Sequence, residues 1–258
     1  MILALDIGNS QIFGGVFDAE DRLRLQFRHA SRAQATSDEL GLFFRDVLRE
    51  NGIDPAGIQT VAICSVVPDM VHSVRNASMK YFNARPFVLE PGVRTGLNIR
   101  YRNPLEVGAD RIAGAIAASQ LFPGRNAIIV DFGTATTIDA LTADRDYLGG
   151  LILPGLRLAM ESLDAKTARL PKVEIRKPPE LLGRTTVESI QAGLYYGNVA
   201  ILRHLCAELR DCYFKGGTTV LLGTGGFARL FEDEGVFDAH VPELVLLGLR
   251  EALRLNAE

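Results

Sequence analysis

Residues 1–10 read MILALDIGNS and residues 11–17 read QIFGGVF. This stretch holds two apolar runs, over 2–6 and 12–17, separated by the turn-forming residues Gly8, Asn9 and Ser10. Apolar runs of this length, bounded by turn residues, are typical of strands. Apolar and polar residues then alternate over 23–27, as in a half-exposed strand. The stretch therefore predicts a three-stranded meander in which Asp6 ends the first strand.

Helices and strands alternate after the meander. In the first half we expect a helix beginning at the capping-box pair Thr36 and Glu39, strands over 60–64 and 86–89, and helices over 68–82 and 111–121. In the second half we expect strands over 127–131, 136–141, 147–153 and 218–222, helices over 154–168 and 185–209, a helix from 227, and a buried helical segment over 242–256.

The pattern of strand, acid, glycine and polar turn occurs twice, at Asp6 and at Asp131. Each copy lies in the same order of strands and helix, which indicates an internal duplication. We therefore expect an α/β protein of two duplicated domains with a nucleotide cleft between them. The first would cover 1–117, completed by a C-terminal helix over 242–258, and the second would cover 118–241.

The composition excludes several classes of protein. Of 258 residues, 47% are hydrophobic and 23% are charged, as in ordinary globular chains. A net charge of −3 gives no reason to expect nucleic acid or an anionic membrane as partner. The chain has three scattered cysteines, which argue against a disulfide framework or a zinc site. The first residues lack the basic region of a signal peptide, so we expect a cytoplasmic protein without membrane spans.

The loop after the first strand has residues suited to phosphate binding. Gly8 would let the backbone approach a ligand, and the groups of Asn9 and Ser10 would donate to phosphate oxygens. Asp6 would hold a hydrated magnesium ion, which prefers one or two carboxylates together with phosphates and water. The alternative is a β-hairpin in which these residues only make the turn.

The second copy, DFGTATT over 131–137, replaces the amide with hydroxyls, and a threonine-rich strand is its alternative interpretation. Further on, residues 223–228 (GTGGFA) follow an expected strand and open a helix. They fit a dinucleotide-binding turn, but no acidic partner for a ribose follows. A glycine turn against which an adenine or ribose lies is the better interpretation, and a tight strand-to-helix turn is the alternative.

Residues 108–111 (GADR) precede an apolar helix. Asp110 is suited to cap that helix. It is also suited to act as a general base that takes the proton of a substrate hydroxyl, while Arg111 orients an anionic group.

These motifs together resemble those of type III pantothenate kinases, members of the superfamily of actin, sugar and acetate kinases and heat-shock chaperones. YRNPLEVGADR over 101–111 and DFGTATT over 131–137 are specific in combination. The matching stretches are 6–9, 65–68, 101–111, 131–137, 147–154, 183–193 and 224–228.

The resemblance implies ATP-dependent phosphorylation of the primary hydroxyl of pantothenate, the first step toward coenzyme A, on a duplicated ribonuclease-H-like fold. It implies ATP contacts from Asp6, Ile7, Gly8, Asn9, Ser10, Gln11, Ile12, Phe13 and Thr134. It implies pantothenate contacts from Tyr101, Gly108, Ala109, Asp110, Arg111 and Thr186, with Asp110 as proton acceptor. It further implies that Asp131 ligates potassium or ammonium, that magnesium accompanies ATP, and that a homodimer completes the pocket, so that Thr186 acts in one subunit's site or the other's.

The chain departs from the family pattern after Asn9, where Ser10 and Gln11 stand in place of the usual threonine and asparagine. Serine keeps the hydroxyl and glutamine is longer by one methylene, so an ATP contact moves without disappearing. Two other functions compete with the kinase: a nucleotide-sensing protein without catalysis on the same scaffold, and a nicotinamide dehydrogenase built on residues 223–228.

Overall fold

The computed structural model describes residues 1–166, 170–214 and 216–257. The chain divides into two compact units. Unit 1 comprises Met1–Gly96, Arg102–Ala117 and the segment from Leu244 onward, and unit 2 comprises Leu97–Tyr101 and Ala118–Glu243. None of the described helices combines the length and the apolar character needed to cross a bilayer.

A five-stranded sheet in the order β3-β2-β1-β4-β5 forms the centre of unit 1. Its strands are β1 (Ile2–Ile7), β2 (Gln11–Phe17), β3 (Leu23–Ala30), β4 (Thr60–Ser65) and β5 (Phe87–Val88). The central strand β1 is antiparallel to β2 and parallel to β4. The end of β1 that carries Asp6 is therefore also the carboxyl end of β4, the kind of sheet edge at which α/β proteins bind ligands.

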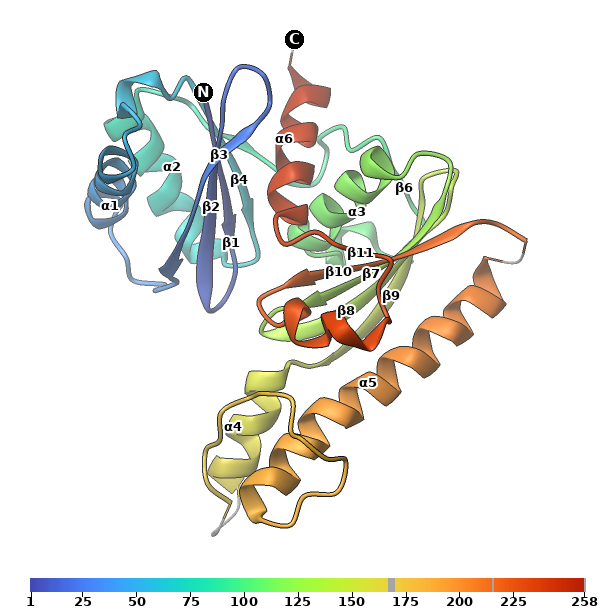
Figure 1. The fold of residues 1–258 in the computed structure, drawn as a ribbon. Helices are drawn as coiled ribbons and strands as arrows, with labels where there is room; N and C mark the ends of the chain where they lie inside the picture. The colour runs from blue at the N-terminus through green and yellow to red at the C-terminus, as the bar shows by residue number, and fades with distance from the viewer. Residues whose placement is uncertain (167–169, 215, 258) are drawn as a thin grey trace. The chain divides into compact units, whose positions relative to one another are not determined.

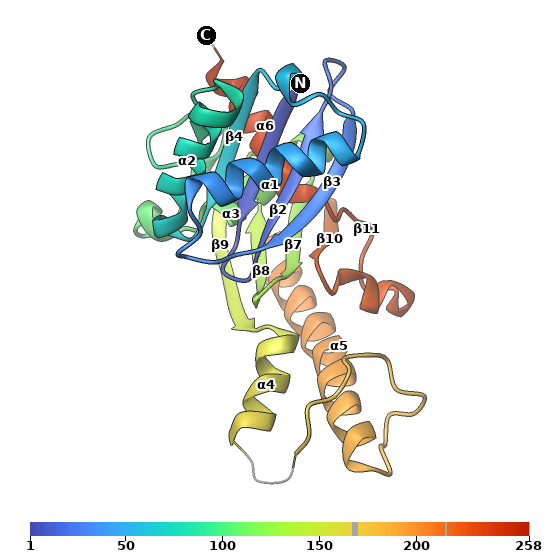
Figure 2. The same cartoon turned by 90° about the vertical axis from the view of Figure 1, so that its left-hand side faces the viewer.

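Helices cover both faces of this sheet (Figures 1 and 2). They are α1 (Ser37–Glu50), α2 (Pro68–Phe82), α3 (Ala109–Leu121) and α6 (Leu244–Asn256), with short 3₁₀ turns η1 (Pro55–Gly57) and η2 (Pro104–Glu106). Leu40 and Phe44 of α1 join Met70 and Val74 of α2 in one core with the strands. On the other face α6 packs on β1 and β4 and touches α3, where Gly248 lies directly against the backbone of Ala113.

Unit 2 is built on a six-stranded sheet in the order β11-β10-β7-β8-β9-β6. Its elements are β6 (Asn98–Ile99), β7 (Asn126–Phe132), β8 (Ala135–Leu141), β9 (Asp146–Pro154), α4 (Leu156–Lys166), α5 (Thr186–Tyr213), β10 (Thr219–Gly225), η3 (Ala228–Glu234) and β11 (Ala239–His240). Phe132 and Tyr195 both stack on Phe231, with ring centroids 4.9 Å and 5.4 Å away, and the three rings belong to the core of unit 2. Helix α4 and the first turns of α5 extend past the end of the sheet, with residues 170–185 running beside them (Figure 1).

The two sheets repeat one strand order. The order β3-β2-β1-β4-β5 in unit 1 corresponds to β9-β8-β7-β10-β11 in unit 2, and β6 is an addition at the edge. In both units the first two hairpins are antiparallel and the fourth strand joins the first in parallel. The expected duplication and the mixed α/β fold are confirmed.

The structure corrects three local expectations. The predicted helix over 154–168 begins only at Leu156, because strand pairing with β8 continues through Pro154; residue 168 lies outside the described residues. The segment from 227 forms a 3₁₀ helix and no α-helix. The two-residue strands β6 and β11 were not predicted, because two residues carry no periodicity.

Candidate active site

The Asp6–Phe13 segment spans the end of β1, a turn and the start of β2. Asn9, Ser10 and Gln11 are exposed at the turn, which closes through a 3.0 Å hydrogen bond from the Gly8 amide to the Gln11 carbonyl. Ser31 braces the turn from β3's end, since its hydroxyl donates to the Gly8 carbonyl at 2.6 Å. The turn thus presents amides and polar side chains to solvent from a fixed backbone.

Three residues of the predicted ATP-binding set have buried side chains that a ligand could not contact. The side chains of Ile7 and Ile12 are fully buried in the core of unit 1, so only their backbone could reach a ligand. Phe13 is also buried, and the guanidinium of Arg28 lies 4.1 Å from its ring centroid. These residues therefore hold the loop in place, while the exposed turn carries the groups that could donate.

A buried thiol stands beside two carboxylates in unit 1. Cys64 of β4 lies opposite Asp6 in the strand register and is fully buried. Burial raises the pKa of this thiol well above its usual value. The negative charges of Asp6 and Asp110, and a hydrogen bond between the thiol and Asp6, raise that pKa further. The thiol therefore stays protonated, and Asp6 and Asp110 belong to one small region at the sheet edge.

Asp110 is the second residue of α3, one position inside the helix. The cap position belongs to Gly108, whose carbonyl accepts the first helical hydrogen bond from the Ile112 amide at 3.2 Å. The predicted capping role of Asp110 is therefore wrong. Its Oδ1 accepts from the Arg111 amide at 2.8 Å and lies so close to Gly108 that a Cβ there would overlap it. Gly108 thus makes room for the carboxylate, and Ala109 and Arg111 flank it, both partly exposed.

Asp131, near the carboxyl end of β7, lies against the glycine turn that follows β10. Gly225 has a φ of +85°, and a Cβ on it would overlap Asp131 Oδ1 and the Phe132 backbone. The Gly226 amide donates to the Phe132 carbonyl at 3.0 Å. Strands β7 and β10 therefore bring the two glycine-containing motifs of unit 2 together, with Thr134 exposed at the tip of the β7–β8 turn.

The surroundings of Asp131 suit a hard cation. No three or more His, Cys, Asp or Glu side chains gather into a metal-binding group among the described residues. A carboxylate beside a close-packed turn, with backbone and threonine oxygens nearby, is the donor set that potassium or magnesium accepts, whereas zinc prefers nitrogen and sulfur. The residues around Asp131 therefore fit a cation held mainly by oxygen.

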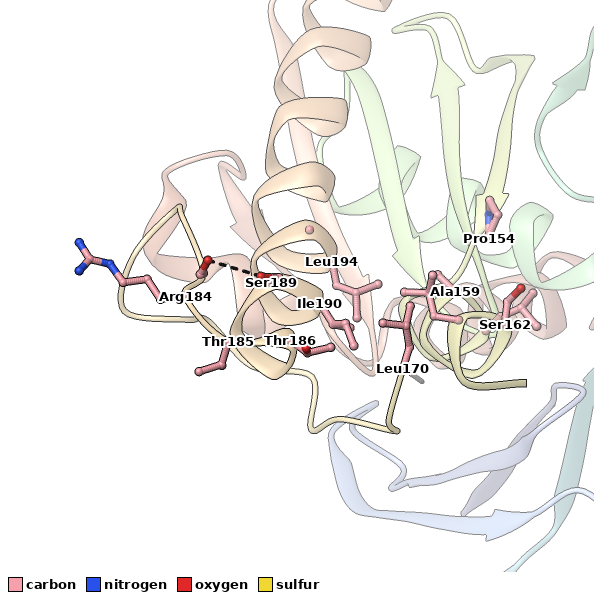
Figure 3. Close-up of a pocket in the computed structure, with 14 residues that line it drawn as sticks. Pro154, Ala159, Ser162, Leu170, Arg184, Thr185, Thr186, Ser189, Ile190 and Leu194 are labelled. Atoms are coloured by element: carbon pink, nitrogen blue, oxygen red, sulfur yellow. Dashed lines mark hydrogen bonds between the residues drawn. The ribbon is translucent and has the colours of Figure 1, made fainter. Parts of the chain in front are cut away.

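Thr186 is the first residue of α5 and lines a cavity of about 1240 Å³ between α4, α5 and residues 170–185 (Figure 3). The preceding Thr185 caps the helix, because its Oγ1 accepts from the Glu188 amide at 3.2 Å while Glu188 Oε2 accepts from the Thr185 amide at 3.1 Å. Hydrogen bonding, chiefly from the Arg184 amide, lowers the pKa of Glu188 and keeps it ionised for this role. Apolar side chains such as Ile190 line most of the cavity.

The predicted site residues thus fall into four places. Unit 1 holds the Asp6 loop and the first turn of α3, and Cys64 lies near the carboxylates of both Asp6 and Asp110. In unit 2, Asp131 and Thr134 lie at and just after the carboxyl end of β7, Tyr101 lies beside β9, and Thr186 lies in the α4–α5 cavity, whose described lining includes none of the other three. Cys64 was missed, although pairing the two predicted strands in register would have placed it opposite Asp6.

The chemistry of these parts is compatible with phosphoryl transfer: the turn after β1 exposes polar groups, and Asp6, Asp110 and Asp131 supply carboxylates. The model of the type III pantothenate kinase family matches residues 2–208 of the chain. A type III pantothenate kinase from Legionella pneumophila (strain Corby) is 54% identical over 256 residues, which cover 99% of each chain.

Solved structures share the fold at low sequence identity. A conserved Campylobacter jejuni protein assigned to the Baf family of transcriptional activators superposes with a TM-score of 0.62 at 20% identity, covering 98% of both chains. An archaeal actin homologue gives a TM-score of 0.53 at 14% identity, covering 98% of this chain and 99% of its own. The expected actin-like fold is thereby confirmed. With the family model and the Legionella relative, the motifs place this chain in the type III pantothenate kinase family.

Proposed function

We propose that this protein transfers the γ-phosphoryl group of ATP to the primary hydroxyl of pantothenate, giving 4'-phosphopantothenate for coenzyme A synthesis. The observation that carries the proposal is the end-to-end identity of 54% to a type III pantothenate kinase. The motif residues Asp6, Asp110 and Asp131 are all present in this chain.

Asp110 is the proposed general base. Its carboxylate takes the proton of the pantothenate hydroxyl as that oxygen attacks the γ-phosphorus; the bond from the γ-phosphorus to the bridging oxygen breaks, and ADP leaves with the electron pair. Support comes from its place in the first turn of α3, where Gly108, and not Asp110, is the cap.

The ATP-binding set consists of the Asp6–Phe13 loop and Thr134, with the exposed amides and hydroxyls supplying most of the donors. Asp6 is the residue that would hold magnesium with ATP, and Asp131 is the ligand for potassium or ammonium. Magnesium would neutralise charge on the phosphates when bound. The Ser10-Gln11 pair lies at the exposed turn, so its departure from the family pattern affects ATP affinity more than the fold.

Tyr101, Gly108–Arg111 and Thr186 form the proposed pantothenate set, completed across a homodimer. The supporting feature is the apolar surface around Thr186, where Leu158 is 49% exposed, Leu181 70% and Leu182 76%. Apolar patches of this kind are typical of contact surfaces between subunits. We place the reaction in the cytoplasm, where ATP is made and where the three free cysteines would stay reduced.

The test is ADP release by the purified protein with ATP, magnesium and pantothenate, comparing potassium with sodium. Release that requires pantothenate and rises with potassium is expected. ATP binding without pantothenate-dependent ADP release under any cation would instead favour a non-catalytic nucleotide-binding protein.

A further inference from the structure

Tyr101 is delivered to its position by the short edge strand β6. Backbone hydrogen bonds flank this strand on its β9 side: the Asn98 amide donates to the Arg145 carbonyl at 2.9 Å and the Arg100 amide to the Tyr147 carbonyl at 2.8 Å. Asn98 and Ile99 pair in parallel with Asp146 and Tyr147 (Figure 1). The residue before Tyr101 is therefore fixed to β9.

The side chain of Asp146 strengthens this attachment. Its Oδ1 accepts from Asn98 Nδ2 at 2.9 Å and lies 3.1 Å from the guanidinium of Arg100. These hydrogen bonds, Asn98 first, lower the pKa of Asp146, so the carboxylate is ionised at neutral pH. One carboxylate thus contacts the side chain of Asn98, which begins β6, and that of Arg100, which follows it.

Gly149 decides how closely the Tyr101 ring approaches β9. It has a φ of +115°, and a Cβ built on it would lie 3.1 Å from Tyr101 Cε2 and 3.2 Å from Cδ2. Both separations are shorter than ordinary van der Waals contact between carbons. The ring can lie where it does only because residue 149 has no side chain.

The strand beneath this contact is anchored by pairing with β8 and by a buried hydrogen bond. Tyr147 is fully buried, and its hydroxyl donates to Asp139 Oδ1 at 2.6 Å within the sheet. Strand β9 shifts register between Ala140 and Leu141 of its partner, next to Gly149. An added methyl group would therefore displace the ring more readily than the strand.

We propose that Gly149 and Asp146 are positioning residues for Tyr101 and so set the affinity for the acceptor substrate. This inference rests on the proposed function, in which Tyr101 contacts pantothenate. Neither residue needs to touch substrate: Gly149 sets the depth of the ring, and Asp146 holds the strand that carries it.

The first experiment is steady-state kinetics of Gly149→Ala and Asp146→Ala. Each should raise KM for pantothenate, on the order of tenfold for Gly149→Ala, and leave KM for ATP within about twofold. Gly92→Ala is the matched control, because Gly92 also has a positive φ, +99°, but has no atom within 4 Å of an added Cβ. Its φ is closer to that of Gly149 than the φ of Gly124 is, and the variant should leave both KM values unchanged.

Combining each variant with Tyr101→Ala separates an effect on the position of the Tyr101 ring from a general disturbance of the protein's structure. In the Tyr101→Ala background, Gly149→Ala should change KM for pantothenate less than about twofold, because the ring it displaces is gone. An equal rise in both backgrounds, or the same rise in Gly92→Ala, would overturn the proposal.

An NMR spectrum of protein with labelled tyrosine rings tests the position of the Tyr101 ring without measuring enzyme activity. The chain has six tyrosines, so ring-labelled tyrosine gives few signals and Tyr101→Phe assigns one of them. Gly149→Ala should shift that signal and Gly92→Ala should not. A wild-type protein that does not phosphorylate pantothenate would refute the proposed function and the substrate part of this inference; an unmoved Tyr101 signal would refute the positioning itself.

Discussion

Asp110 and Asp69 occupy the same position in two helices of unit 1, the second residue, and differ in their surroundings. Asp110 lies near a buried thiol that hydrogen-bonds to Asp6, whereas Asp69 is exposed in the first turn of α2. Asp110→Asn should lower kcat by about 10²-fold or more, the usual contribution of a general base. Asp69→Asn loses a similar interaction with the helix dipole and should keep kcat within about twofold.

Measured kcat, with circular dichroism to confirm folding, decides between the two roles of Asp110. Turnover close to wild type in Asp110→Asn would mean that the carboxylate only supports the start of α3.

Single residues also mark the limit of sequence interpretation. The acids at Asp6, Asp110 and Asp131 were predictable because each follows a strand or opens a helix. The burial of Ile12 and the approach of Gly225 to Asp131 were not, because both depend on which strands become neighbours. Likewise, Asp110 has a side chain suited to capping, yet the helix begins at Ala109, two residues before the expected start at 111.

Helices α1 and α5 begin with the same kind of capping box, so the same substitution can be compared at the start of each helix. Thr36 and Glu39 start α1, and Thr185 and Glu188 start α5 next to Thr186. Thr36→Ala and Thr185→Ala should each cost about 1 kcal/mol of unfolding free energy. Only Thr185→Ala should raise KM for pantothenate severalfold, because it loosens the turn that carries Thr186.

Thermal unfolding and steady-state kinetics of both variants provide the measurement. If KM for pantothenate is the same in the two variants, the capping box of α5 stabilises the helix and nothing more.

The long elements were predictable, whereas β5 is the one strand of two residues that was expected among the described residues. The apolar or alternating patterns of the eight longer strands in the described residues and the caps of α1 and α5 are local signals, so these elements appear within a few residues of their expected bounds. Strand β6 exists only because residues 98–99 pair with β9 far along the chain. The delivery of Tyr101 to Gly149 therefore could not be read from local sequence.

At the scale of the whole molecule, the proposed homodimer predicts that charge on the apolar surface near Thr186 separates the subunits. Leu158, 49% exposed, lines the α4–α5 cavity, while Leu42, 53% exposed, lies on α1. Leu158→Asp should shift the protein toward monomer in sedimentation equilibrium and lower pantothenate turnover, and Leu42→Asp should do neither. Wild-type protein that sediments as a monomer at micromolar concentration would refute the shared pocket.

The duplicated architecture and the family were both predictable from motifs, since the repeat around Asp6 and Asp131 carries the strand order of each unit. The α4–α5 cavity was not predictable, because its walls come from helices and a connecting segment whose packing no periodicity describes.

Helix α6 closes unit 1 although it comes after every element of unit 2. During synthesis β1 leaves the ribosome first, whereas α6, the helix that covers one face of β1 and β4, leaves last. The sheet of unit 2 is complete in sequence before that moment. The half of the protein that is translated first is therefore the half that finishes folding last, and until then it must be kept from aggregating with an uncovered sheet face.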